Sequence, residues 1–200
     1  MSIWTWCLPI AGPSTDGTTE RLGARARSGR LATVTTSYDR LMADRKPPRL
    51  ATDAFATLTA LLDYQRTSLV GKVAGLTTAQ AAWSPVPSGT SLLWLIGHMA
   101  DAEQSWVVRR FAGRPVELPG GAVTGKSDDL DESVAAYRAT WQVVDAIVAD
   151  TSDPGEHCRA DDADPPVDLM WIIAHLVEET ARHAGHADIL RELIDGQTGR

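Results

Sequence analysis

Three of the five histidines of this 200-residue chain fall in one short segment, AHLVEETARHAGHAD. The ligand-type side chains of this segment are His175, Glu178, Glu179, His183, His186 and Asp188. Residues four apart on an α-helix are turned by about 40° and separated by about 6 Å along the axis, so both can bind one metal ion. Glu179 and His183 have this spacing, as do His175 and Glu179, while His183 and His186 are three apart. The spacing alone leaves these pairs as alternatives.

His98 is the candidate for a further ligand from a distant part of the chain. It lies among Leu95, Ile96 and Met99, where its ring would project toward an apolar interior or its edge. A buried polar group without a partner costs roughly 1 to 3 kcal/mol, so it needs a hydrogen bond, a water molecule or a metal. An ordinary hydrogen-bonded histidine is one interpretation. The other is a site with two ligands from one helix and one from another, whose open position is typical of a catalytic metal.

Four stretches of amphipathic helical periodicity position these side chains. Apolar residues recur three, four and seven apart over about residues 52–74, 91–111, 130–149 and 168–194. Thr90 or Ser91 is placed to cap the second helix, and Gly75 and Gly196 to end the first and the last. No strand pattern competes, and the connections are too long to force simple hairpins. The pattern predicts an all-α fold, a four-helix bundle with crossover connections.

The first 45 residues differ in composition from the rest of the chain. They are rich in Gly, Ser, Thr and Arg and have no sustained periodicity, which predicts a disordered N-terminal extension over residues 1–45. The periodic part, residues 50–196, is large enough for one domain.

Composition and charge exclude several classes of protein. With 44% hydrophobic and 22% charged residues the chain is typical of globular proteins, and its apolar runs are too short to span a membrane. Residues 51–200 hold eleven Lys and Arg against twenty-two Asp and Glu, an acidic balance that disfavours nucleic-acid binding. Cys7 and Cys158 are too few for a disulfide framework, and the apolar start breaks at Pro9 before it resembles a secretory signal. We therefore expect a cytoplasmic protein.

Other conspicuous side chains receive structural interpretations. We expect packing without chemistry from four tryptophans, Trp94, Trp106, Trp141 and Trp171. Arg182 and Arg191 are expected to pair on the surface with Glu178 and Glu192. The alternative is that they bind a carboxylate group of the substrate. The candidates for accepting the second N–H of a ligand imidazole are Asp101, Glu103 and Asp188.

Three segments together resemble the DinB-like superfamily, and more closely its actinobacterial branch of mycothiol-dependent transferases. The segments are LLDYQRTSLVGKVAGLTTAQ, PSGTSLLWLIGHMADAEQSWV and WIIAHLVEETARHAGHADILRELIDG, and the similarity covers about residues 50–196. The resemblance implies a four-helix bundle with a divalent metal held by one histidine of the second helix and two residues, four apart, of the fourth. On the matching motifs these ligands are His98, Glu179 and His183.

The chain departs from the commonest form of the superfamily, which has histidine where Glu179 stands, although glutamate is known among its mycothiol-dependent members. Two histidines and one glutamate suit zinc, with nickel as the second choice. His186 stands where many relatives carry glutamine. We therefore regard His186, together with His175, as a candidate for supporting a ligand or facing the substrate.

The resemblance implies a metal-dependent transferase in which the thiol of mycothiol, or another low-molecular-weight thiol, ionises at the open metal position and attacks an electrophilic substrate. No nucleophile from the protein is required, and no catalytic residue is assigned. The same site could activate water for hydrolysis or promote an isomerisation. The chain could also be a metal-binding, stress-response bundle of DinB-like type without catalytic activity. A homodimer is compatible with such a bundle.

Overall fold

The computed structural model describes residues 46–51, 53–115, 127–160 and 166–198. The extension predicted for residues 1–45 lies outside these residues. The helices of the described part are α2 (Ala54–Gly71), α3 (Thr78–Ala82), α4 (Leu92–Glu103), η1 (Gln104–Phe111), α5 (Leu130–Asp150) and α6 (Leu169–Asp195). Among these helices, none combines the length and the apolar character needed to cross a bilayer.

The helix ends lie close to the predicted positions because capping residues mark them. The side chain of Ser91 accepts the backbone N–H of Trp94 at the start of α4, and Asp168 accepts that of Trp171 at the start of α6. Gly75 and Gly196 follow α2 and α6 with φ of 74° and 77°, a left-handed conformation that favours glycine. Gly196 is the C-cap of α6, so the predicted end at this position is confirmed, whereas α2 already ends at Gly71, four residues before Gly75.

The second predicted helix changes its hydrogen-bond pattern halfway along. After Glu103 the α-helix α4 continues without a break as the π-helix η1. The backbone N–H of Ala112, for example, donates to the carbonyl of Val107, five residues earlier, at 3.0 Å. Such segments are rare and frequently lie at functional sites. Periodicity predicted the helix but not this change.

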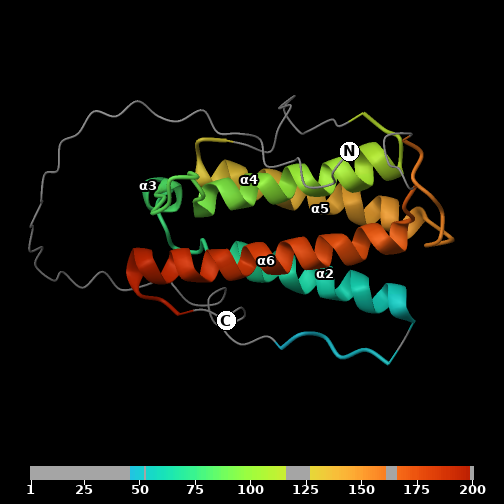
Figure 1. Cartoon of the computed structure of the whole chain (residues 1–200), viewed down its shortest axis with the longest axis horizontal. Helices are drawn as coiled ribbons and strands as arrows, with labels where there is room; N and C mark the ends of the chain where they lie inside the picture. Colours follow the sequence, from blue (N-terminus) through green and yellow to red (C-terminus); the bar gives the residue numbers. More distant parts are fainter. Residues whose placement is uncertain (1–45, 52, 116–126, 161–165, 199–200) are drawn as a thin grey trace, which may run out of the picture.

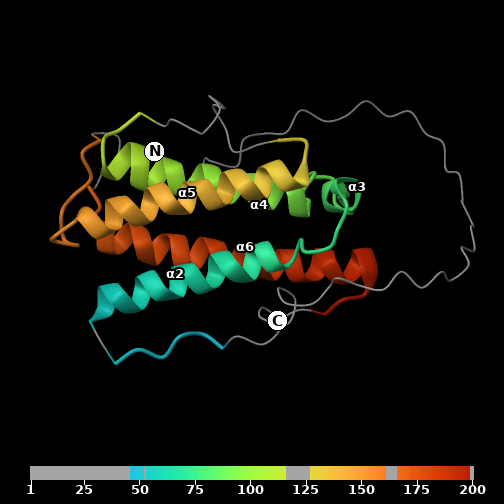
Figure 2. The same ribbon diagram turned by 180° about the vertical axis from the view of Figure 1, so that it is seen from behind.

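The four long helices form a bundle with a crossover connection between α4 and α5. Figure 1 shows α4 and α6 side by side on one face, and Figure 2 shows α5 and α2 on the opposite face. In both views α4 and α5 run in one direction and α2 and α6 in the other. Because α4 and α5 are parallel neighbours in the chain order, the connection between them is of the crossover type. The predicted all-α bundle with crossover connections is confirmed.

A charged network crosses the core between α2, α4 and α5. Arg66 is 1% exposed and Glu103 is fully buried, and they form a two-pronged ion pair with N–O distances of 2.9 and 2.6 Å. Arg66 also contacts Asp145 at 2.8 Å, and the Tyr137 hydroxyl donates to Glu103 at 3.0 Å. Burial raises the pKa of Glu103 and the Arg66 charge opposes that shift. Glu103 is thus a core residue whose two oxygens are bound by Arg66 and Tyr137, so it is not the one of the three candidates that orients a ligand imidazole.

Candidate metal centre

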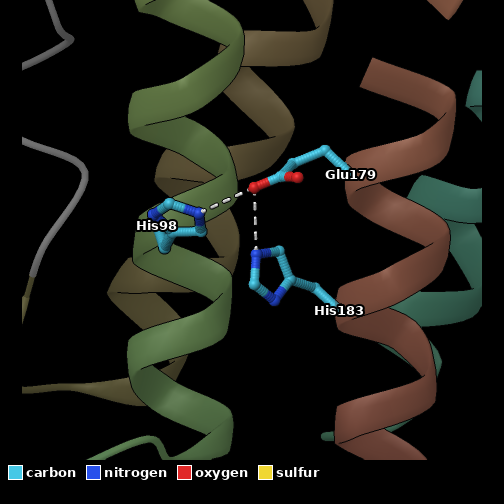
Figure 3. A group of neighbouring side chains, drawn as sticks. All are labelled: His98, Glu179 and His183. Carbon is cyan, nitrogen blue, oxygen red and sulfur yellow. Dashed lines mark ion pairs between the residues drawn. The ribbon is translucent and has the colours of Figure 1, made fainter. Parts of the chain in front are cut away.

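The structure brings His98, Glu179 and His183 together between α4 and α6. Figure 3 shows both imidazoles pointing toward the carboxylate. Atom Oε1 of Glu179 lies 3.6 Å from Nε2 of His98 and 3.3 Å from Nε2 of His183. The two helices lie side by side, and Glu179 and His183 are one turn apart on α6. Two segments about 80 residues apart in sequence therefore meet at one point.

The spacing of these three atoms fits a divalent metal ion. Zinc binds imidazole nitrogen and carboxylate oxygen at about 2.0–2.2 Å, so two ligand atoms of a tetrahedral site stand about 3.4 Å apart. The measured separations of 3.6 and 3.3 Å are close to that value, and all three ligand atoms lie within 4.8 Å of one another. Two nitrogens and one oxygen form a donor set that suits zinc.

The candidate site opens to the surface of the bundle. The side chains of His98, Glu179 and His183 are 26%, 20% and 12% exposed. Three protein ligands and a partly exposed face are the arrangement of metal sites that accept a further, exchangeable ligand. A small molecule from solution can therefore reach the group.

The two oxygens of Glu179 have different partners. Oε1 faces the two imidazoles, and Oε2 lies 3.3 Å from Nη1 of Arg182. Hydrogen bonds from His183 and His98 hold the pKa of the Glu179 carboxyl well below its usual range, so the group is a carboxylate at neutral pH. Arg182 also pairs with Glu178, which confirms the predicted surface pair. Oε1 is therefore the oxygen available to a cation.

Trp94 contacts the site, contrary to the expectation that it serves packing alone. Its ring stacks on that of His98 with centroids 4.7 Å apart and an angle of 6° between the planes. It also meets His183 edge to face at 6.3 Å. Trp94 and His98 are four apart on α4, and this spacing is the signal in the sequence that could have indicated the contact.

His186 lies on the outer side of His183. Its Nδ1 is 3.4 Å from Nδ1 of His183, while Nε2 of His183 faces Glu179. If His183 carries its proton on Nδ1, this N–H donates a hydrogen bond to Nδ1 of His186. Nε2 of His183 is then unprotonated and free to bind a metal. The position fits a residue that supports a ligand.

His175 lies one turn before Glu179 and belongs to a different cluster. Its ring stacks on that of Trp171 at 5.1 Å, and it meets Trp106 edge to face at 5.0 Å. Burial lowers the pKa of His175, which favours the neutral ring at neutral pH. The spacing of four residues left two pairs open, His175 with Glu179 and Glu179 with His183. The structure brings the second pair together with His98.

Two further residues of α6 have partners that differ from the predicted ones. Asp188, a candidate for orienting an imidazole, pairs through Oδ1 with Nζ of Lys72 at 2.5 Å. Arg191 is buried and pairs with Asp195 at 2.8 Å instead of Glu192. Its guanidinium also donates to the carbonyls of Lys72 and Ala74 at 2.9 and 2.8 Å. Both side chains therefore attach the end of α2 to α6.

Comparisons with known proteins place these observations in a family. A family model described as mycothiol-S-transferase matches residues 57–196, which include all three residues of the candidate site. The crystal structure of a conserved protein from Enterococcus faecalis has a similar fold, with a TM-score of 0.54 and 18% sequence identity. The similarity covers 74% of this chain and 100% of that chain. No curated protein matches the chain significantly.

Proposed function

Because the chain belongs to the mycothiol-S-transferase family, we propose that it joins the thiol of mycothiol to an electrophilic substrate at a metal centre formed by His98, Glu179 and His183. The observation that carries this proposal is the convergence of the three side chains within the matched segment. They come from two helices and present two imidazole nitrogens and one carboxylate oxygen to a single point.

The three side chains have distinct parts in this centre. His98 and His183 offer neutral nitrogen ligands, and Glu179 offers one negative charge, which suits zinc and admits nickel. A divalent metal held by these three residues would supply a positive charge that lowers the pKa of a thiol bound beside it and so favours the thiolate at neutral pH. Trp94 holds the plane of the His98 ring, and His186 holds that of His183.

The reaction requires no nucleophile from the chain. A sulfur–carbon bond forms between the thiol and the electrophilic carbon, the leaving group departs with its electron pair, and the thiol proton passes to solvent. The residues of the site therefore bind and orient the reactants. Their partial exposure admits both reactants from the same face of the bundle.

Thiol-dependent turnover of a generic electrophile tests the proposal. We expect product to form with mycothiol at a rate above the spontaneous reaction, and to fall to that background in His98→Ala and His183→Ala. His157→Ala, an exposed histidine of the loop before α6, is the matched control and should keep its activity. Equal activity in the wild type and the two ligand variants would contradict the proposal.

A further inference from the structure

Two rows of side chains face each other along the α4–α6 side of the bundle. Each row places one residue every four positions. The row on α6 is Trp171, His175, Glu179 and His183. The row on α4 and η1 is Trp94, His98, Ala102, Trp106 and Arg110. His98 meets Glu179 in the middle and Trp106 meets Trp171 at one end, so the candidate metal centre is one part of a longer surface.

The end of this surface beyond Glu179 is an aromatic cluster. We call Trp106, Trp171 and His175 the aromatic platform. The centroids of the Trp106 and Trp171 rings are 5.4 Å apart, and each of these rings also contacts His175, at 5.0 and 5.1 Å. The guanidinium of Arg110 lies over the Trp106 ring at 4.3 Å and is itself buried. The three rings therefore support one another in a fixed arrangement.

Part of the platform is open to solvent. Trp171 is 40% exposed, although an indole ring is among the most favourable side chains to bury. His175 is half-buried, and its lowered pKa leaves it uncharged at neutral pH. The platform thus offers flat, uncharged ring surfaces to a ligand.

The platform lies within reach of a substrate at the metal centre. His175 precedes Glu179 by one helical turn, which is about 6 Å along the axis, and Trp171 precedes it by two turns. In the opposite row only Ala102, with its small side chain, stands between His98 and Trp106. A planar group held on the platform can therefore extend a reactive carbon toward His98, Glu179 and His183.

We propose that the aromatic platform is the subsite for the electrophilic substrate and that it selects electrophiles that carry a planar aromatic group. This inference rests on the proposed transferase function. Planar apolar groups stack on indole and imidazole rings and remove them from water. The polar groups that a hydrophilic thiol requires lie at the other end of the rows, at His183 and His186.

Two alkylating agents with the same reactive group separate this selectivity from general reactivity. Monobromobimane carries its bromomethyl group on a planar bicyclic ring, and bromoacetamide carries the same carbon–bromine bond without a ring. In both, the thiol sulfur bonds to the methylene carbon, bromide leaves with the bonding electrons, and the thiol proton passes to solvent. Rates are taken above the spontaneous reaction for the wild type, Trp171→Ala and Trp171→Phe. The matched control is Trp83→Ala, because Trp83 is 44% exposed and follows α3 at a distance from the platform.

We expect Trp171→Ala to raise the KM for monobromobimane about three- to tenfold, as the loss of one aromatic contact predicts. Trp171→Phe should recover most of this loss, and the KM values for bromoacetamide and mycothiol should not change. Equal effects on both electrophiles, or none, would overturn the inference. If only the KM for mycothiol rose, the aromatic platform would belong to the thiol subsite, and this result would also overturn the inference.

If the protein turns over neither electrophile, that result counts against the proposed function itself. A binding measurement then still tests the aromatic platform. The probe is then tetramethylbimane, an unreactive molecule with the same ring system, measured by equilibrium dialysis. Binding by the wild type and Trp83→Ala, with at least threefold weaker binding by Trp171→Ala, supports the platform. Equal binding by all three proteins, or none, overturns it.

Discussion

Trp94 shows how much of this site depends on side chains that are not ligands. Its ring lies nearly parallel to that of His98, at 4.7 Å, and keeps Nε2 of His98 directed at Glu179. Residues that orient a ligand commonly contribute 10- to 100-fold to metal affinity. We predict that Trp94→Ala weakens zinc binding by about tenfold, measured by competition with a chromogenic chelator.

Trp94→Phe keeps a flat ring over His98, so it should retain most of the zinc affinity. Trp83→Ala removes an exposed tryptophan elsewhere and should leave the affinity unchanged. Zinc binding by Trp94→Ala as tight as that of the wild type would show that the stacking has no part in holding the ligand.

The resemblance to the DinB-like superfamily predicted which three side chains meet, whereas the spacing alone left several pairs open, and neither indicated which neighbours support the three residues. Glu103 was a candidate for supporting a ligand because it is close to His98 in the chain. Five residues along an α-helix are a rotation of about 140°, so Glu103 points into the core while His98 faces α6. Trp94, at four residues, shares the face of His98. Its role depends on the rotation of α4, which the approximate periodicity of one helix does not determine.

The buried pair of Arg66 and Glu103 connects α2 to α4. Both side chains are removed from water, so each needs the charge of the other. We predict that Arg66→Met lowers the free energy of unfolding by about 3–5 kcal/mol, because it leaves the Glu103 carboxylate buried without its cation. Urea denaturation measures the change.

The double variant Arg66→Met, Glu103→Met provides the control. Removing both charges should cost less than the sum of the two single variants, since no uncompensated charge remains. Strict additivity of the two changes would contradict a direct interaction between them.

The end of α6 provides a pH-dependent contact. A hydrogen bond from Arg191 lowers the pKa of Asp195. A carboxyl whose pKa is lower in the folded state adds stability above its unfolded pKa of about 3.9, and this contribution is lost as the pH falls through the folded value. We predict that Asp195→Asn is less stable than the wild type at pH 6 and that the difference shrinks as the pH falls below the unfolded pKa of about 3.9. Urea titrations at several pH values test this, and a difference that persists in acid would contradict it.

The helix boundaries were predictable because short-range contacts set them. Ser91 and Asp168 cap α4 and α6 through residues three positions away, and Gly196 ends α6 by its own conformation. The change to a π-helix at Gln104 depends on the surroundings of the helix. Gln104 is buried and donates to Oγ1 of Thr140 on α5 at 2.7 Å, a contact that the local sequence does not indicate.

The bundle as a whole places its ligand-type side chains on the contact between α4 and α6. Long connections predicted crossovers, but a long connection allows either direction for the next helix. The packing of the complete core therefore determines that α4 and α5 run in the same direction. It also determines that α4 packs against α6. The same pairing sets the aromatic platform beside the candidate metal centre.

Metal binding should stabilise the whole molecule, because the three ligands come together only in the folded state. Free zinc at about 100 times its Kd is expected to add about 2.7 kcal/mol to the free energy of unfolding. We predict a raised Tm for the wild type in zinc and no rise for His183→Ala, measured by circular dichroism. An equal rise in both proteins would indicate binding elsewhere on the chain.

Metal content per chain tests the central claim most directly. It is measured by mass spectrometry on the purified wild type, on His98→Ala, Glu179→Ala and His183→Ala, and on the control His157→Ala. We predict about one equivalent of zinc or nickel in the wild type and the control, and its loss in the three ligand variants. No bound metal in the wild type after reconstitution with zinc or nickel, or full retention in the three ligand variants, would contradict the account.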